Sequence, residues 1–118
     1  MTIGVDPYSI NQSNVYKLYV VGGIRTEKVK VDFKSNWPDY VFSKEYKLKS
    51  IGEVSKYIKE HNQLPNMPSA QQVKDDGIDL GQMQSKLLQK IEELTLYVIE
   101  QNDRIHQLEF KISKLKHK

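Results

Sequence analysis

Hydrophobic residues in the last third of the chain follow a seven-residue repeat with alternating spacings of three and four. The two core positions of this repeat are called a and d, and together they form the seam. Nine of the eleven seam residues are aliphatic. The a positions are Gln84, Ile91, Val98, Ile105 and Ile112, and the d positions are Leu80, Leu87, Leu94, Gln101, Leu108 and Leu115. This pattern predicts one long helix that associates with other copies through its seam.

Capping residues set the expected ends of this helix. Asp79, followed three residues later by Gln82, is typical of a helix N-cap. No proline or glycine interrupts the chain from residue 82 to about Lys116. The expected rod is on the order of 55 Å long.

Two shorter helices are predicted before it. Ser50 with Glu53 favours a first helix that ends near residues 61–62. Ser69 opens a second helical segment of a turn or two, and Gly77 stops it. Both short helices are expected to pack near the base of the rod, on apolar residues outside the seam.

The N-terminal part has the pattern of β-strands. Residues 15–21 are rich in β-branched and aromatic side chains, and Gly22-Gly23 favours a turn. Residues 24–33 alternate between apolar and charged side chains, which is typical of a half-buried strand. Two or three short strands do not form a stable sheet alone, so we expect them to need other copies or upstream sequence.

The number of copies is suggested by the hexad of residues 104–109. Ile or Val at a with Leu at d favours a parallel dimer on the simplest rule. The hexad, however, resembles the short trimerisation motif of parallel three-stranded coiled coils, with Arg104 and Glu109 flanking two aliphatic core residues. In that motif the arginine pairs with the glutamate of a neighbouring helix. Gln101 at d also suits a polar ring around a threefold axis. We therefore expect a trimer, with a chance charge pair in a dimer as the alternative.

An aromatic cluster occupies the stretch between the predicted strands and helices. It consists of Trp37, Tyr40, Phe42 and Tyr46. One interpretation is that these rings pack the junction between the β part and the helical part, since each aromatic buries about 150–250 Å². The alternative is a recognition surface in which the rings stack on sugars or bases.

Composition narrows the possible chemistry. The chain has 118 residues and a formal charge of +3, which is too small to indicate nucleic-acid binding. It has no cysteine, no apolar run of the roughly 20 residues that a membrane span needs, and no signal-peptide pattern at its start. The three histidines do not have metal-ligand spacing, and residues 75–79 lack the spacing of a calcium loop. We expect no catalytic site, no metal and no cofactor.

Several segments, taken in order, are similar to a recurrent C-terminal region of bacterial surface and phage-tail-fibre-like proteins. The segments that carry the resemblance are residues 16–25, 29–31, 37–42, 64–70, 81–83 and 87–97. The resemblance implies a trimeric fibre end, in which strands of three chains wrap together before a three-helix coiled coil. Such ends fold and register the trimer while upstream segments bind the target. A neighbouring group of fibre ends cleaves itself at a motif that begins with Ser-Asp, a pair this chain lacks.

The predicted fold class is therefore α+β and elongated: intertwined strands, then short helices, then a parallel three-stranded coiled coil. The expected divisions are residues 1–35, 36–78 and 79–118. The expected function is non-enzymatic trimerisation of a fibre-like protein, with a receptor- or glycan-binding tip as the alternative and a self-cleaving chaperone as a weaker one. The expected partners are two further copies, upstream fibre segments and a surface glycan or receptor. The expected location is extracellular, on a cell surface or a phage-like particle, with the export signal encoded upstream.

Overall fold

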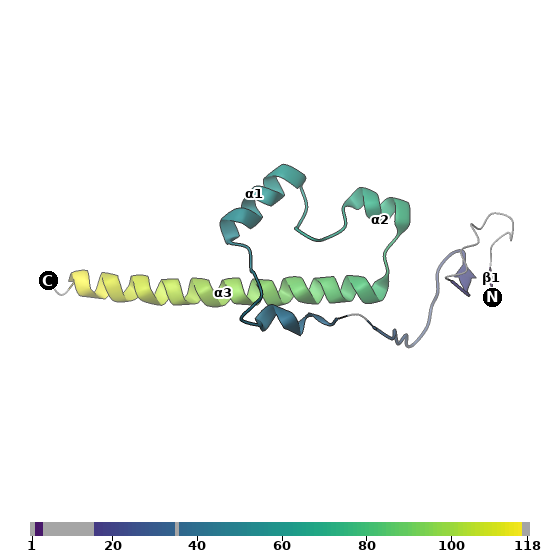
Figure 1. Cartoon of the computed structure of the whole chain (residues 1–118), viewed down its shortest axis with the longest axis horizontal. Helices are drawn as coiled ribbons and strands as arrows, with labels where there is room; N and C mark the ends of the chain where they lie inside the picture. The colour runs from purple at the N-terminus through teal and green to yellow at the C-terminus, as the bar shows by residue number, and fades with distance from the viewer. Residues whose placement is uncertain (1, 4–15, 35, 117–118) are drawn as a thin grey trace. The chain divides into compact units, whose positions relative to one another are not determined.

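The computed structural model describes residues 2–3, 16–34 and 36–116. The chain divides into two compact units, Met1–Lys30 and Val31–Lys118. Some sequence-based expectations lie outside the described residues, among them the start of the first predicted strand at Val15 and the last histidine, His117. In the described part the chain is mostly helical, with three α-helices, as Figure 1 shows.

The first unit contains one short parallel pairing. Strand β1, Thr2–Ile3, pairs with β2, Tyr19–Val20, and Thr2 lies opposite Tyr19. Gly22 follows with a φ of 90°, in agreement with a turn there. The strand predicted over residues 15–21 is thus confirmed only at its centre.

The second predicted strand is absent from the single chain. Residues 24–33 have no strand assignment, and nearly all of them are exposed. Alternation indicates which face a strand would bury, but a strand forms only where another strand can pair with it. The α+β class is therefore confirmed for its helices and not for its strand content.

Helix α1 spans Ile51–His61, as its caps predict. The Ser50 hydroxyl accepts a hydrogen bond from the Glu53 backbone N–H at 3.1 Å. Asn62 ends the helix in the left-handed conformation, with a φ of 55°. No residue of α1 is buried, so the helix is held mainly by its ends and by one partly covered face.

Helix α2 is the short segment Ala70–Asp76. Ser69 and Gln72 form a reciprocal capping box, with the two hydrogen bonds at 3.2 and 2.8 Å. Gly77 ends it with a φ of 71°, a value that favours glycine. Both the start and the stop agree with the prediction.

Helix α3 spans Leu80–Lys116 and contains 37 residues. Its N-cap is Asp79, whose carboxylate accepts a hydrogen bond from the Gln82 N–H at 3.0 Å. Gly81 lets the chain approach closely, because a Cβ there would lie 3.1 Å from Val31 Cγ1. The predicted long helix is confirmed from its N-cap to Lys116, the last described residue.

A 3₁₀ helix, η1, occupies Pro38–Phe42, within the stretch that the sequence predicted as a linker. Trp37 precedes it in the extended conformation that a following proline favours. Pro38 and Val41 are fully buried where η1 packs on α3. Figure 1 shows η1 along one side of α3 and the two short helices on the other.

The hydrophobic core of the second unit is small. Among the described residues, the buried hydrophobic side chains are Val41 and Tyr97, and two prolines, Pro38 and Pro65, are buried as well. A core of this size is far below what a domain of about 90 residues needs to be stable alone. Most of the large hydrophobic side chains of the described residues are therefore exposed in the single chain.

Candidate functional site

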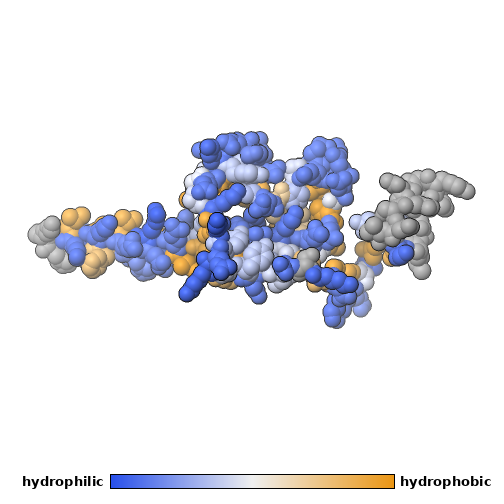
Figure 2. Space-filling model, in the orientation of Figure 1, coloured by the Kyte–Doolittle hydropathy of each residue, from blue (hydrophilic) through white to orange (hydrophobic). Residues whose placement is uncertain are grey.

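The seam of α3 is exposed along its whole length. Each of its nine aliphatic side chains is between 48% and 67% exposed. Gln84 and Gln101, which complete the seam, are exposed as well. Figure 2 shows hydrophobic residues on the surface of the C-terminal part of α3, where no other element covers it.

The chain packs on α3 at positions outside a and d. Gly81 at position e, Glu92 at b and Tyr97 at g are its three buried residues. Positions b, c and f lie opposite the seam, while e and g flank it. The segment that follows Val31 thus covers the outer arc of α3 up to Tyr97 and leaves the a/d arc open.

A hydrogen-bond network fixes this segment to the outer face of α3. The Tyr46 hydroxyl donates to Glu93 Oε1 at 2.7 Å and accepts from Gln89 Nε2 at 3.1 Å. Lys90 Nζ lies 3.4 Å from the other oxygen of Glu93. Burial, together with the hydrogen bond to Glu93, raises the pKa of Tyr46 to about 12. The hydroxyl therefore stays protonated and donating throughout the neutral range.

A second contact ties the start of α1 to α3. The Tyr97 hydroxyl donates to the backbone carbonyl of Lys49 at 2.5 Å. Burial, and then the nearby carboxylates of Glu93, Glu53 and Glu100, raise the pKa of Tyr97 above its ordinary value.

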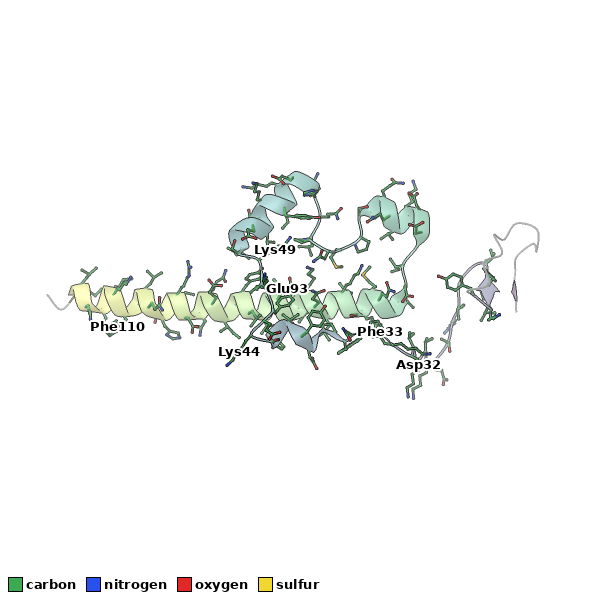
Figure 3. All side chains as sticks on the ribbon, viewed as in Figure 1. Asp32, Phe33, Lys44, Lys49, Glu93 and Phe110 are labelled. Atoms are coloured by element: carbon green, nitrogen blue, oxygen red, sulfur yellow. The ribbon has the colours of Figure 1, made fainter. Side chains whose placement is uncertain are left out.

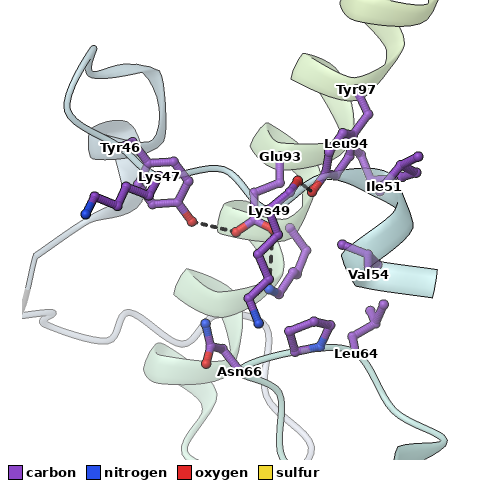
Figure 4. A pocket seen from close by; sticks show the side chains of 12 residues that line it. Tyr46, Lys47, Lys49, Ile51, Val54, Leu64, Asn66, Glu93, Leu94 and Tyr97 are labelled. Atoms are coloured by element: carbon purple, nitrogen blue, oxygen red, sulfur yellow. Dashed lines mark hydrogen bonds and ion pairs between the residues drawn. The ribbon is translucent and has the colours of Figure 1, made fainter. Parts of the chain in front are cut away.

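Between these contacts lies a cavity of about 140 Å³ (Figure 4). Ile51 and Val54 of α1, Leu64 and Pro65 of the following loop, and Leu94 of the seam form its apolar wall. The polar groups around it are Tyr46, Lys47, Lys49, Asn66, Lys90 and Glu93, with Tyr97 completing the lining. The cavity thus lies beside the seam and shares a residue with it.

Glu92 is the one buried charged residue among those described, at 6% exposure. Its Oε2 atom has no hydrogen-bond partner among the described residues. Burial, and secondarily the charge of Asp39 on η1, raise the pKa of this carboxyl above its ordinary value. The outer b position of the heptad predicts a solvated glutamate, and this prediction is wrong for Glu92, because η1, a segment distant in the sequence, packs on α3.

The hexad residues are exposed on the C-terminal half of α3. In the single chain, Arg104 lies 3.7 Å from Glu100, one turn earlier on the same helix. Glu109 lies 4.0 Å from His106 Nδ1. Both pairs are largely in solvent, so they contribute little to stability. Arg104 and Glu109 remain available to a neighbouring helix.

Among the described residues, three rings of the aromatic cluster have a ring neighbour and Phe42 has none. Trp37 packs edge-on against Phe33 at 5.4 Å between ring centroids, and Tyr40 contacts Tyr46 at 5.8 Å. Trp37, Tyr40 and Phe42 are 42–55% exposed in the single chain. The side chains that anchor η1 are therefore Pro38 and Val41. In the sequence, the sign of this anchor was an apolar residue, Val41, three positions after Pro38, which places both on one face of a short turn.

Within the described ranges, no group of three or more His, Asp or Glu side chains is placed to hold a metal ion. None of the helices described there is long and apolar enough to cross a membrane. Figure 3 shows the side chains of α3 pointing outward along its C-terminal half, with Phe110 among them.

Searches of protein-family models, of curated proteins and of solved structures found no match to this chain.

Proposed function

We propose that this chain is a non-enzymatic trimerisation end of a fibre-like protein, in which three copies bury their α3 seams against one another. The observation that carries the proposal is the uninterrupted exposed seam. A helix that its own chain covers on the outer faces as far as Tyr97, and leaves exposed at all eleven a and d positions, has the surface of one strand of a coiled coil.

Energetics support self-association over a lone chain. About half of each aliphatic seam side chain is exposed, and burying it is worth roughly 1 kcal/mol per residue. Nine such residues per chain are more than the short core of η1 and α3 offers by itself. The second copy is the natural partner, because parallel identical helices place a against a and d against d.

The choice of three copies rests on the polar features of the seam. Gln101 at a d position can close a hydrogen-bonded ring around a threefold axis. Arg104 at g and Glu109 at e have the spacing of an inter-helix pair, and a bidentate arginine–carboxylate contact favours one geometry over others. A dimer is the alternative outcome of the test.

Within this proposal residues 24–33 form strands only between copies. Residues 24–33 keep their alternating pattern but find no strand in one chain. Three copies held in register by α3 bring three such segments together, as in the fibre ends that the sequence resembles. The setting would be a cell surface or a phage-like particle, with upstream fibre segments preceding this end.

Sedimentation-equilibrium mass at micromolar concentration tests the proposal. The expected mass is three times the 13.8 kDa of one chain. A mass of two chains would show that the seam forms a dimer. A mass of one chain would show that the seam does not bind other copies.

A second candidate function is a receptor- or glycan-binding tip. The exposed rings of Trp37, Tyr40 and Phe42 favour it, because aromatic faces can stack on sugar rings. A glycan array probed with the intact protein and with a Trp37→Ala variant separates the two functions. Binding that Trp37→Ala abolishes supports a tip, and no binding leaves assembly as the function.

A further inference from the structure

The cavity beside Leu94 is partly open to solvent and has two unlike sides (Figure 4). One side is apolar and consists of Ile51, Val54, Leu64, Pro65 and Leu94. The other side carries polar and charged groups, namely Tyr46, Lys47, Lys49, Asn66, Lys90 and Glu93. A molecule that fits both sides needs an apolar part and a polar part.

Lys90 is the charged group with the most unused hydrogen-bonding capacity in this lining. Its side chain is only 12% exposed, and burying an ammonium is costly unless the group is paired. Among the described residues its one acceptor is Glu93 Oε2, at 3.4 Å. Because an ammonium has three N–H donors, two of them remain for the oxygen atoms of a ligand.

The charge around the cavity favours an anion. Glu93 is the one carboxylate of the lining, and both of its oxygens already accept hydrogen bonds, from Tyr46 and from Lys90. Lys47 and Lys49 have no ion pair within the part of the chain that the structure describes. Three lysines against one glutamate leave a formal excess of two positive charges, which attracts a negatively charged group.

The volume and the apolar wall limit the rest of the ligand. The cavity measures about 140 Å³, and a cavity of about 150 Å³ in another protein accepts benzene. The body of the ligand is therefore about one six-membered ring in size. Side chains such as Ile51, Val54 and Leu64 offer no hydrogen bonds, so a sugar would leave its hydroxyl groups unpaired against them.

We propose that the cavity binds a small organic carboxylate with a hydrocarbon body of about one ring. The body contacts the apolar wall, and the carboxylate accepts hydrogen bonds from Lys90, with Lys49 adding positive charge. All the lining residues belong to one chain, so each copy carries its own site whatever the number of copies. This binding function is separate from assembly through the seam.

A methyl-detected nuclear magnetic resonance titration with benzoate tests the site on the intact chain. The methyl signals of Ile51, Val54 and Leu64 should shift to saturation, with a dissociation constant on the order of 1 mM, while those of Val73 on α2 should not. Absence of a saturable shift at the three lining residues overturns the proposal.

Three further probes separate the parts of the ligand. Benzyl alcohol has the ring without the charge, acetate has the charge without the ring, and glucuronate has a carboxylate on a hydroxylated ring. Each should bind at least about tenfold more weakly than benzoate, because each loses one of the two kinds of contact. Equal or tighter binding of any one of them overturns the proposed chemical class.

Substitution of the lysines gives an independent test. Lys90→Met keeps the length of the side chain and should raise the dissociation constant of benzoate at least about tenfold. This change also removes a partner of Glu93, so the exposed Lys49→Met is measured beside it, with an expected rise of about threefold. Lys59→Met, on α1 but outside the lining, is the matched control and should change nothing. Unchanged binding in both Lys49→Met and Lys90→Met overturns the site, whereas the mass of the chain tests the proposed trimer separately.

Discussion

The two halves of α3 differ in how far other segments of the same chain cover them. From Leu80 to Tyr97 the helix is covered on its outer faces by η1, by the segment around Tyr46 and by the start of α1. From Val98 to Lys116 every residue is exposed. The seam nevertheless continues through both halves without a change of spacing.

This difference indicates what the seam is for. In the covered half the seam residues Ile91 and Leu94 stay exposed, whereas Glu92 and Tyr97, on neighbouring faces of the same helix, are buried. In the bare half about 19 residues of helix have no packing partner among the described residues, although most helical stability in proteins comes from the packing of an apolar face. Both halves are explained if the seam is reserved for other copies.

The largest expected effect comes from a charge on the seam of the bare half. Val98→Asp would place a carboxylate in each copy at the core of the assembly, at a cost of several kcal/mol per chain. We expect monomers and a loss of helical circular dichroism. Ile99→Asp is the control, since Ile99 is about as exposed in the single chain (52% against 61%) but lies off the seam. Equal effects of the two variants would refute a role for the seam.

The next effect concerns the covered half. Val41→Ala removes two methyl groups from the side chain that anchors η1, which is 1% exposed. The free energy of unfolding should fall by about 2 kcal/mol, while the mass stays that of a trimer. Val73→Ala, at a position 36% exposed on α2, should cost clearly less in the same denaturant titration. Loss of the trimer in Val41→Ala would mean that association through the seam depends on the packing of η1 on α3.

The hexad has a smaller effect, on the count of copies more than on stability. Replacing Arg104 and Glu109 together with alanine should cost about 1 kcal/mol per chain and give mixed dimers and trimers in sedimentation velocity. Glu100→Ala removes the partner that Arg104 has in the single chain and should leave a trimer. A pure trimer in the double variant would make the hexad incidental.

The smallest expected effect is a pH dependence in the covered half. The pKa of Glu92 is raised above its ordinary 4.5, so the folded state favours the protonated carboxyl. The contact of η1 with α3 is then most stable below pH 4.5 and weakens as the pH rises through the raised pKa. Glu92→Gln should be more stable than the unmodified protein at pH 7, and the difference in melting temperature should vanish near pH 4. A Glu60→Gln control on exposed α1 should show no such difference, and a destabilising Glu92→Gln would contradict this account.

Helix boundaries were predictable because they depend on local chemistry. Asp79 and Ser69 cap helices through hydrogen bonds three residues away, and Gly77 ends α2 through its own backbone. The spacing of the seam is equally local. These features lie in the sequence within a few positions of where they act.

The parts that were missed depend on contacts between distant segments. η1 has no periodicity over its five residues, and the burial of Val41 comes from a helix that starts about forty positions later. The strand expected over residues 24–33 failed in the single chain because alternation does not provide a pairing partner. The cavity beside Leu94 likewise combines α1, the loop after it and α3, so no local pattern indicates it.

The most direct test of the central claim is the mass of the intact chain in solution, measured by sedimentation equilibrium across micromolar concentrations. If three seams bury one another, the mass is three times 13.8 kDa and stays constant as the concentration falls through the micromolar range. A mass of one chain at every concentration would contradict the account, because the exposed seam would then have no copy to cover it.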